Sequence, residues 1–197
     1  MPLKTLVKVG SITNLSDARY CAGMGVEMLG FNVVTGHESF IDAKKYQEIR
    51  GWVTGPAVVA EIYNLNPESL SEIVENYAPE YLELAAKDLS ILPSEISTPL
   101  ILKVDEDTFT NQQSVINSRK DQIAHIIIDQ SEASAEFITA VSNQFSVLLS
   151  PEKDVNINSV LDALPVKGIA LNGSQEIKPG LKDYDHLAEV LELLEEE

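Results

Sequence analysis

The sequence predicts an α/β protein built as a compact (β/α)8 TIM barrel, and three observations favour this fold. Short runs rich in valine, isoleucine and leucine alternate with longer amphipathic segments, a pattern typical of repeated strand–helix units and a parallel sheet. Eight apolar runs can be counted. A length of 197 residues holds eight such units in one domain, 1–197, slightly below the usual size of the fold. A doubly wound open sheet is the alternative, although no glycine-rich nucleotide-binding loop follows any predicted strand.

Each predicted strand is an apolar run of four to six residues bounded by polar or turn-forming residues. The predicted strands are 5–10, 28–33, 57–62, 81–85, 100–104, 125–129, 146–149 and 168–171.

The helices are predicted from capping residues and apolar periodicity. Asn14, with Asp17 three residues later, is a cap pattern that begins the first helix, and Pro67 begins the third in a similar way. The clearest late helices are 134–143 and 183–194, the second with an apolar stripe at helical spacing.

The fourth unit is the weakest of the eight. Between its strand and Pro93, residues 87–92 provide barely one helical turn.

Composition narrows the possible partners. The chain has 14 lysines and arginines against 31 acidic residues, a formal charge of −17, which argues against nucleic acid and anionic membranes as partners. Its single cysteine, Cys21, fits a reducing compartment, and no apolar run approaches the ~20 residues that span a bilayer. We therefore expect a cytoplasmic protein, and the oligomeric state is left open.

Several segments resemble the phosphoribosylanthranilate isomerases of tryptophan biosynthesis. Residues 8–13 read Lys-Val-Gly-Ser-Ile-Thr where that family has Lys-x-Cys-Gly-Ile-Thr, and 25–31 are similar to its Gly-Ala-Asp-x-Leu-Gly-Phe. Residues 60–64 read Ala-Glu-Ile-Tyr-Asn where the family has Gly-Val-Phe-Val-Asn. The last unit, 168–176 with 178–183, resembles the family's Gly-Val-Asp-Val-Ser-Ser-Gly-Val-Glu and Pro-Gly-x-Lys-Asp.

The resemblance implies an Amadori rearrangement with one catalytic group missing. In the family, an acid protonates the ribose ring oxygen, the ring opens to an imine, and a base removes the C2 proton. Asp129, at the end of the sixth predicted strand, stands at the general-acid position. Gly10 stands at the position of the cysteine base and carries no proton acceptor, and the hydroxyl of Ser11 would need an activating base of its own.

The phosphate site that the resemblance implies is also altered. Barrel phosphate sites use N–H groups of the loops after strands seven and eight. After strand seven, Pro151 removes a donor and Glu152 adds negative charge, which Lys153 could partly offset. The candidate phosphate-binding residues are Ser150, Asn172, Gly173 and Ser174.

Charged residues inside the predicted strands form a further candidate group. They are Lys8, Glu61, Glu83, Lys103 and Asp129, and alternation places all but Glu61 on the inward face. Two interpretations stay open: a structural ion-pair network inside the barrel, or a site in which Lys8, Glu83 and Asp129 act on a ligand.

No cofactor or metal ion is expected. His37, His125 and His186 share no spacing typical of metal ligands. His37 lies in the loop after the second strand and is the one histidine placed to touch a ligand.

Three hypotheses for function follow. The first is a divergent isomerase-like barrel that has lost or altered the family reaction and is either inactive or binds a related small anion, such as a small phosphorylated metabolite. The second is a working isomerase with a displaced base. The third is a barrel enzyme of other specificity that uses Asp129 and a strand lysine.

Overall fold

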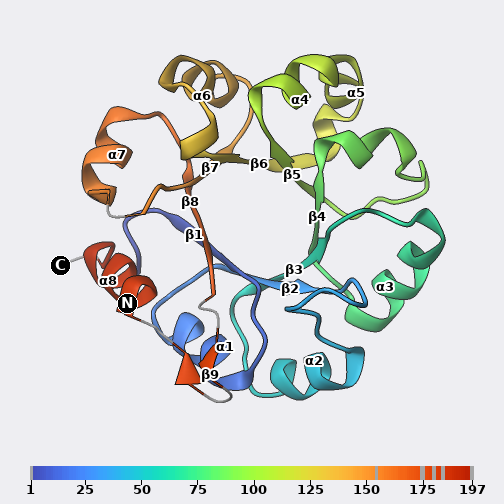
Figure 1. Ribbon diagram of the computed structural model, residues 1–197. Coiled ribbons are helices and arrows are strands. Elements are labelled where there is room, and N and C mark those ends of the chain that lie inside the picture. The colour runs from blue at the N-terminus through green and yellow to red at the C-terminus, as the bar shows by residue number, and fades with distance from the viewer. Residues whose placement is uncertain (1, 154, 174–175, 179–180, 183–184, 196–197) are drawn as a thin grey trace.

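The structure is a computed structural model that describes residues 2–153, 155–173, 176–178, 181–182 and 185–195. Eight parallel strands close into a barrel in the order β1 to β8, and helices surround it (Figure 1). The (β/α)8 fold is therefore confirmed. The open doubly wound sheet is wrong, because β1 pairs with β8 along its whole length and leaves no free edge.

The barrel strands lie close to their predicted positions. They are β1 Leu6–Gly10, β2 Met28–Asn32, β3 Ala57–Ile62, β4 Tyr81–Ala85, β5 Leu100–Val104, β6 Ile123–Asp129, β7 Val147–Ser150 and β8 Gly168–Asn172. Two short strands that were not predicted, β9 Glu176–Lys178 and β10 Leu181–Lys182, pair antiparallel outside the barrel.

The helices fill the connections between the strands. They are α1 Leu15–Gly23, α2 Ala43–Arg50, α3 Leu70–Tyr77, α4 Glu106–Asn111, α5 Gln113–Ser118, α6 Ala135–Ser142, α7 Ile157–Ala163 and α8 Asp185–Leu193. Short 3-10 helices add Pro67–Ser69, Ala86–Ile91, Lys120–Gln122 and Gln130–Glu132. The fourth unit has only the 3-10 helix Ala86–Ile91, as its sequence predicted.

Local signals begin the first and sixth helices where the sequence indicates, whereas Pro67 begins a 3-10 helix and α3 follows from Leu70. The Asn14 side chain accepts a hydrogen bond from the N–H of Asp17, and Ser134 accepts one from Phe137 N–H at the start of α6. The predicted segment 183–194 contains α8, although residues 183 and 184 lie outside the described part of the chain.

Two separate apolar clusters stabilise the barrel. The larger one lies between the strands and the surrounding helices. The smaller one fills the barrel interior and consists of Met28, Val59, Ile101, Ile127, Leu148 and Ala170. Because side chains alternate along a strand, residues two positions beyond these also point inward, toward the carboxyl ends of the strands.

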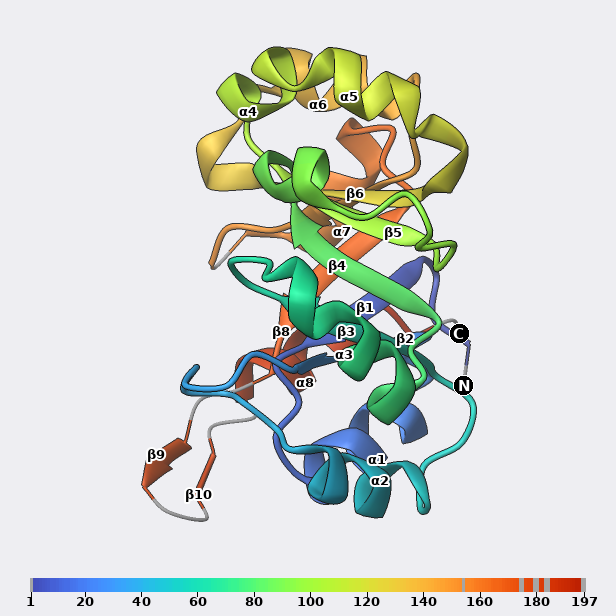
Figure 2. The ribbon, with the colours of Figure 1, turned by 90° about the vertical axis from the view of Figure 1, so that its right-hand side faces the viewer.

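The two ends of the barrel differ in what they carry. Leu3 and Glu195 form an isolated bridge, so both ends of the described chain lie together at one end of the barrel (Figure 2). The carboxyl ends of the strands open at the other end, where TIM-barrel enzymes carry their active sites.

Candidate functional site

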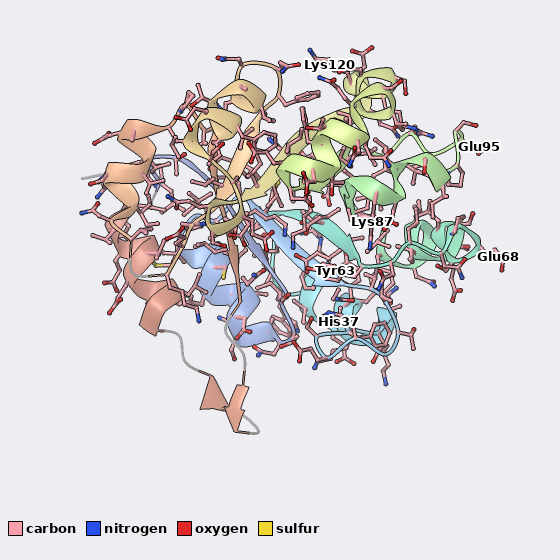
Figure 3. All side chains as sticks on the ribbon, turned by 45° about the horizontal axis from the view of Figure 1, so that its top comes forward. His37, Tyr63, Glu68, Lys87, Glu95 and Lys120 are labelled. Carbon is pink, nitrogen blue, oxygen red and sulfur yellow. The ribbon has the colours of Figure 1, made fainter. Side chains whose placement is uncertain are left out.

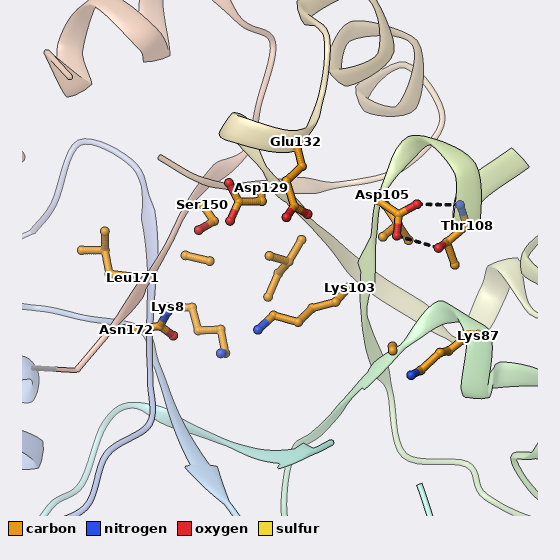
Figure 4. A pocket seen from close by; sticks show the side chains of 14 residues that line it. Lys8, Lys87, Lys103, Asp105, Thr108, Asp129, Glu132, Ser150, Leu171 and Asn172 are labelled. Atoms are coloured by element: carbon orange, nitrogen blue, oxygen red, sulfur yellow. Dashed lines mark hydrogen bonds between the residues drawn. The ribbon is translucent and has the colours of Figure 1, made fainter. Parts of the chain in front are cut away.

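A pocket of about 420 Å³ opens at the carboxyl ends of the strands (Figure 4). This volume lies within the range of small-molecule sites. The charged and polar residues that line it are Lys8, Lys87, Lys103, Asp105, Thr108, Asp129, Glu132, Ser150 and Asn172. The apolar cluster of the barrel interior, through Ile127 and Ala170, lies at its base.

The space beside Gly10, where the resemblance places a cysteine side chain, is filled by Glu61. A Cβ atom built on Gly10 would collide with Oε1 of Glu61, and one built on Gly30 would collide with the same carboxylate. Glu61 is completely buried. Two glycines on neighbouring strands therefore make room for a carboxylate that reaches over them from β3.

The outward face expected for Glu61 is wrong, and the strand register explains why. Glu61 lies two residues after Val59, which belongs to the interior cluster, and it is paired in register with Glu83 on β4. It therefore points inward like Lys8, Glu83 and Lys103. The sequence signal that could have found it is a small residue at the inward end of two adjacent strands, beside a long acidic residue on the third.

Four charged side chains form one ion-pair network under the barrel mouth. Lys8 Nζ lies 2.7 Å from Glu61 Oε1 and 2.6 Å from Glu83 Oε2, and Lys103 Nζ lies 3.5 Å from Glu83 Oε1. The side chains of Lys8, Glu61 and Glu83 are exposed by at most 2%. Two ammonium groups and two carboxylates give this network no net charge, so each buried charge has a partner.

Backbone geometry completes the binding of Glu61. Ser11 takes a left-handed conformation with φ of 54°, and its N–H donates to Glu61 Oε2 at 2.9 Å. Such a conformation is uncommon for a residue other than glycine and stores strain near functional sites. Both oxygens of Glu61 thus accept hydrogen bonds from inside the protein.

Electrostatics keep the network ionised. Burial alone would lower the pKa of Lys8, but the charges of Glu61 and Glu83 outweigh it and raise that pKa above its usual 10.5. Burial alone would raise the pKa of Glu83, but Lys8 and Lys103 lower it below 4.5. The pKa of Lys103 is raised in the same way, chiefly by Glu83, against the effect of burial. Both lysines are therefore cations at neutral pH, which suits ion pairing rather than nucleophilic attack.

Neither oxygen of Glu83 has a hydrogen bond of good geometry to any described residue. The ion pairs of Glu83 with Lys8 and with Lys103 are thus contacts between charges that lack the geometry of a hydrogen bond. Glu83 is held by the field of its two neighbours, which makes it more dependent on them than Glu61 is.

Lys103 connects the network to the pocket. It is 39% exposed, and its ammonium lies 3.4 Å from Tyr63 Oη and 5.1 Å from the centre of the Tyr63 ring. The His37 ring stacks on the Tyr63 ring, with 5.1 Å between their centres (Figure 3). His37 therefore contacts Tyr63, the neighbour of the pocket residue Lys103, and does not itself line the pocket.

Asp129 lines the pocket but lies outside the ion-pair network. Its Oδ1 accepts hydrogen bonds from the N–H and the hydroxyl of Ser131, and its side chain is exposed. In the register it stands beside Ser150, which also lines the pocket. The inward position predicted for Asp129 is confirmed, and its carboxylate is available to a ligand.

The candidate phosphate-binding residues are placed unequally. Ser150 and Asn172 line the pocket, whereas the N–H of Gly173 donates to Gly10 O at 2.7 Å and is already in use. Ser174 lies outside the described residues. The N–H of Glu152 donates to the side chain of Gln130, so this donor of the loop after β7 is already in use.

Comparisons with solved structures agree with this architecture. The structure resembles phosphoribosylanthranilate isomerase from Thermotoga maritima, solved as monomers of a dimeric enzyme, with a TM-score of 0.72, 19% identity and coverage of 96% of this chain and 98% of that one. The enzyme from Thermus thermophilus gives 0.70 and 18%, with 96% and 98% covered. A phosphoribosylanthranilate isomerase in complex with reduced 1-(o-carboxyphenylamino)-1-deoxyribulose 5-phosphate gives 0.71 and 18%, with the same coverage.

The resemblance expected from the sequence motifs is thus confirmed at the level of the fold. No protein-family model and no curated protein sequence matches the chain. Within the part of the chain that the structure describes, no helix is long and apolar enough to cross a membrane.

Proposed function

We propose that this chain is a divergent member of the phosphoribosylanthranilate isomerase family that has lost the Amadori isomerisation and binds a small phosphorylated metabolite at the barrel mouth. The position of the Glu61 side chain is the observation that supports the loss of the isomerisation. Its carboxylate fills the volume of the family's cysteine side chain, and it is buried and hydrogen bonded at both oxygens.

The mechanism explains why this arrangement stops the reaction. A base must come within hydrogen-bond reach, about 2.6–3.2 Å, of the heavy atom whose proton it removes. Glu61 does not line the pocket, and its two oxygens already accept hydrogen bonds from Lys8 and Ser11, so it has no access to a C2 proton. The retained Asp129 at the general-acid position is not enough by itself, because ring opening without C2 deprotonation returns to the starting compound.

Binding is supported by the residues that remain at the mouth. Lys87 and Lys103 supply positive charge to the pocket, and Ser150 and Asn172 supply hydrogen-bonding groups. The structural neighbour solved in complex with a deoxyribulose 5-phosphate derivative supports a phosphorylated sugar as the ligand class.

Conversion of N-(5-phosphoribosyl)anthranilate, followed by liquid chromatography, tests the loss. The wild-type protein should show no turnover above buffer and should not complement a tryptophan auxotroph that lacks its isomerase. Gly10→Cys alone should stay inactive because its side chain collides with Glu61. The double variant Gly10→Cys with Glu61→Val, the residue types of the family at these positions, should gain turnover.

A second candidate function is favoured by the same contact. Because a carboxylate occupies the place of the thiol, Glu61 could act as a displaced base if it released Lys8 or Ser11. Wild-type turnover that Glu61→Gln abolishes would establish this second function and overturn the first. Glu95→Gln, an exposed change at the outer rim of the barrel, is the matched control (Figure 3).

A further inference from the structure

The pocket at the barrel mouth carries six charged side chains, of which two already have full partners. Lys8 is bound by Glu61 and Glu83. Asp105 accepts hydrogen bonds from the N–H and the hydroxyl of Thr108, at 2.7 and 2.6 Å, and so begins α4. The charges that remain for a ligand are Lys87, Lys103, Asp129 and Glu132.

The two carboxylates stand together without a cation. Asp129 ends β6 and Glu132 belongs to the 3-10 helix that follows it, and both are exposed. No lysine, arginine or histidine nitrogen of the described residues lies within 4.0 Å of either one. Figure 4 shows both carboxylates on the same side of the pocket, next to Ser150. An ammonium group from a ligand would find two unpaired negative charges there.

The two lysines lie on the other side of the same pocket (Figure 4). Lys87 is exposed and belongs to the 3-10 helix after β4, and it forms no ion pair with a described residue. Lys103 shares Glu83 with Lys8 and keeps 39% of its side chain exposed. This side therefore suits an anionic group, and an anion placed near Asp129 would be repelled.

We propose that the ligand of this pocket is a small amine that also carries an anionic group. Its ammonium group lies between Asp129 and Glu132, and its phosphate or carboxylate lies at Lys87 and Lys103. The inference rests on the proposed function, since it concerns the ligand of the same site. It adds a protonated amine to the phosphorylated metabolite proposed above, and the ammonium group reduces the repulsion between such a ligand and a protein with a net charge of −17.

Isothermal titration calorimetry of the whole protein with matched sugars tests the amine site and the anion site separately. The matched sugars are glucosamine 6-phosphate, glucose 6-phosphate, glucosamine and glucose, and a fifth sugar, 2-amino-2-deoxyglucuronic acid, carries a carboxylate at C6 in place of the phosphate. Glucosamine 6-phosphate should bind at least tenfold more tightly than glucose 6-phosphate, because only the amine reaches the two carboxylates. The affinity should fall as salt is added, because exposed charges are screened within about 8 Å at physiological ionic strength.

Substitutions test which side chains bind the amine and which bind the phosphate. Asp129→Asn combined with Glu132→Gln should remove the preference for the amine and leave the affinity for glucose 6-phosphate equal or higher. Lys87→Gln should weaken both phosphorylated sugars, and the rim control Glu95→Gln should change neither. The amine assignment is overturned if glucosamine 6-phosphate and glucose 6-phosphate behave alike in the wild-type protein, including when neither binds.

The same set of sugars tests the proposed function separately. A phosphate effect without an amine effect keeps the phosphorylated ligand and rejects this inference. An amine effect in which glucosamine, 2-amino-2-deoxyglucuronic acid and glucosamine 6-phosphate bind equally keeps the carboxylate pair as an amine site, but it rejects both the phosphorylated ligand and the anion site at Lys87 and Lys103.

Discussion

On the β1–β4 side of the barrel mouth, Lys8, Glu61 and Glu83 are almost inaccessible to water and bind one another, whereas on the β6–β8 side Asp129 and Asn172 are exposed. Both sides belong to one ring of inward residues at the carboxyl ends of parallel strands. They differ in whether each charge has a partner inside the protein. The first side therefore depends on each of its partners being present, and the second is available for binding.

This difference bears directly on catalysis. The family reaction needs an acid and a base on opposite sides of one small substrate, and here the acid position lies on the open side while the base position lies on the closed one. Because Glu61 fills the base position on the closed side, the protein lacks the acid–base pair even though Asp129 is retained. Substitutions that open the closed side, or that remove charge from the open side, can break or sharpen this contrast.

The largest effect is expected from Lys8→Met. It leaves Glu61 and Glu83 buried beside each other without their shared cation, and removing one partner of a buried ion pair costs about 3–5 kcal/mol. Urea unfolding of the purified protein measures this loss. The double variant Lys8→Met with Glu61→Val should regain part of it, because Lys103 still pairs with Glu83. Equal stability of Lys8→Met and wild type would show that the network contributes nothing.

A smaller loss is expected from Gly10→Cys. Its Cβ meets Oε1 of Glu61 and lies 3.0 Å from Lys8 Nζ, so the variant overpacks the closed side and should lose about 1–3 kcal/mol. Adding Glu61→Val should restore stability.

Gly23→Ala is the matched control for this substitution. Gly23 ends α1, and a Cβ atom added to it would meet no other atom within 4 Å, so alanine there should be neutral or stabilise by at most about 1 kcal/mol. If Gly10→Cys were tolerated as well as Gly23→Ala, Glu61 would have to be free to move, and the closed side would not be rigid.

The strands could be predicted from the sequence because barrel strands are buried on both faces and read as continuous apolar runs. Leu100–Val104 and Ala57–Ile62 have the predicted bounds. Capping chemistry is equally local, which is why Asn14 identified the start of α1. These features depend on neighbours within a few residues, so they can be recognised in a single sequence.

Glu61 shows where such reasoning ends. Gly10 indicated a missing side chain, but the space it leaves is filled by a residue 51 positions away whose placement depends on strand register and on a second glycine, Gly30. The inward position of Asp129 followed from alternation, whereas its bonds to Ser131 depend on the turn after β6. Contacts across the barrel decide which polar groups stay free, and those contacts appear only in three dimensions.

A third prediction concerns pH. The pKa of Glu83 is lower in the folded protein than its ordinary value of 4.5, so the unfolded chain takes up the proton first as the pH falls. The stabilisation by Glu83 is therefore full above pH 4.5 and is lost as the pH falls through the lowered pKa. Urea unfolding from pH 7 to pH 3 should show the difference between wild type and Glu83→Gln widest at pH 7 and smaller below pH 4.5. A difference that stays constant over this range would mean that Glu83 is not ionised in the network.

The smallest effect is expected from Asp129→Asn on the open side. The group is exposed and forms no ion pair with the described residues, and an amide oxygen can keep both hydrogen bonds from Ser131, so the unfolding free energy should change by less than about 0.5 kcal/mol. Asp129→Ala removes those bonds and should cost about 1 kcal/mol, like the loss of a capping residue. Comparing the unfolding free energies of Asp129→Asn and Asp129→Ala separates the contribution of the charge from that of the hydrogen bonds. Lys8→Met is measured in the same way for comparison. If Asp129→Asn were as damaging as Lys8→Met, Asp129 would belong to the buried network, and the open side would lose its free carboxylate.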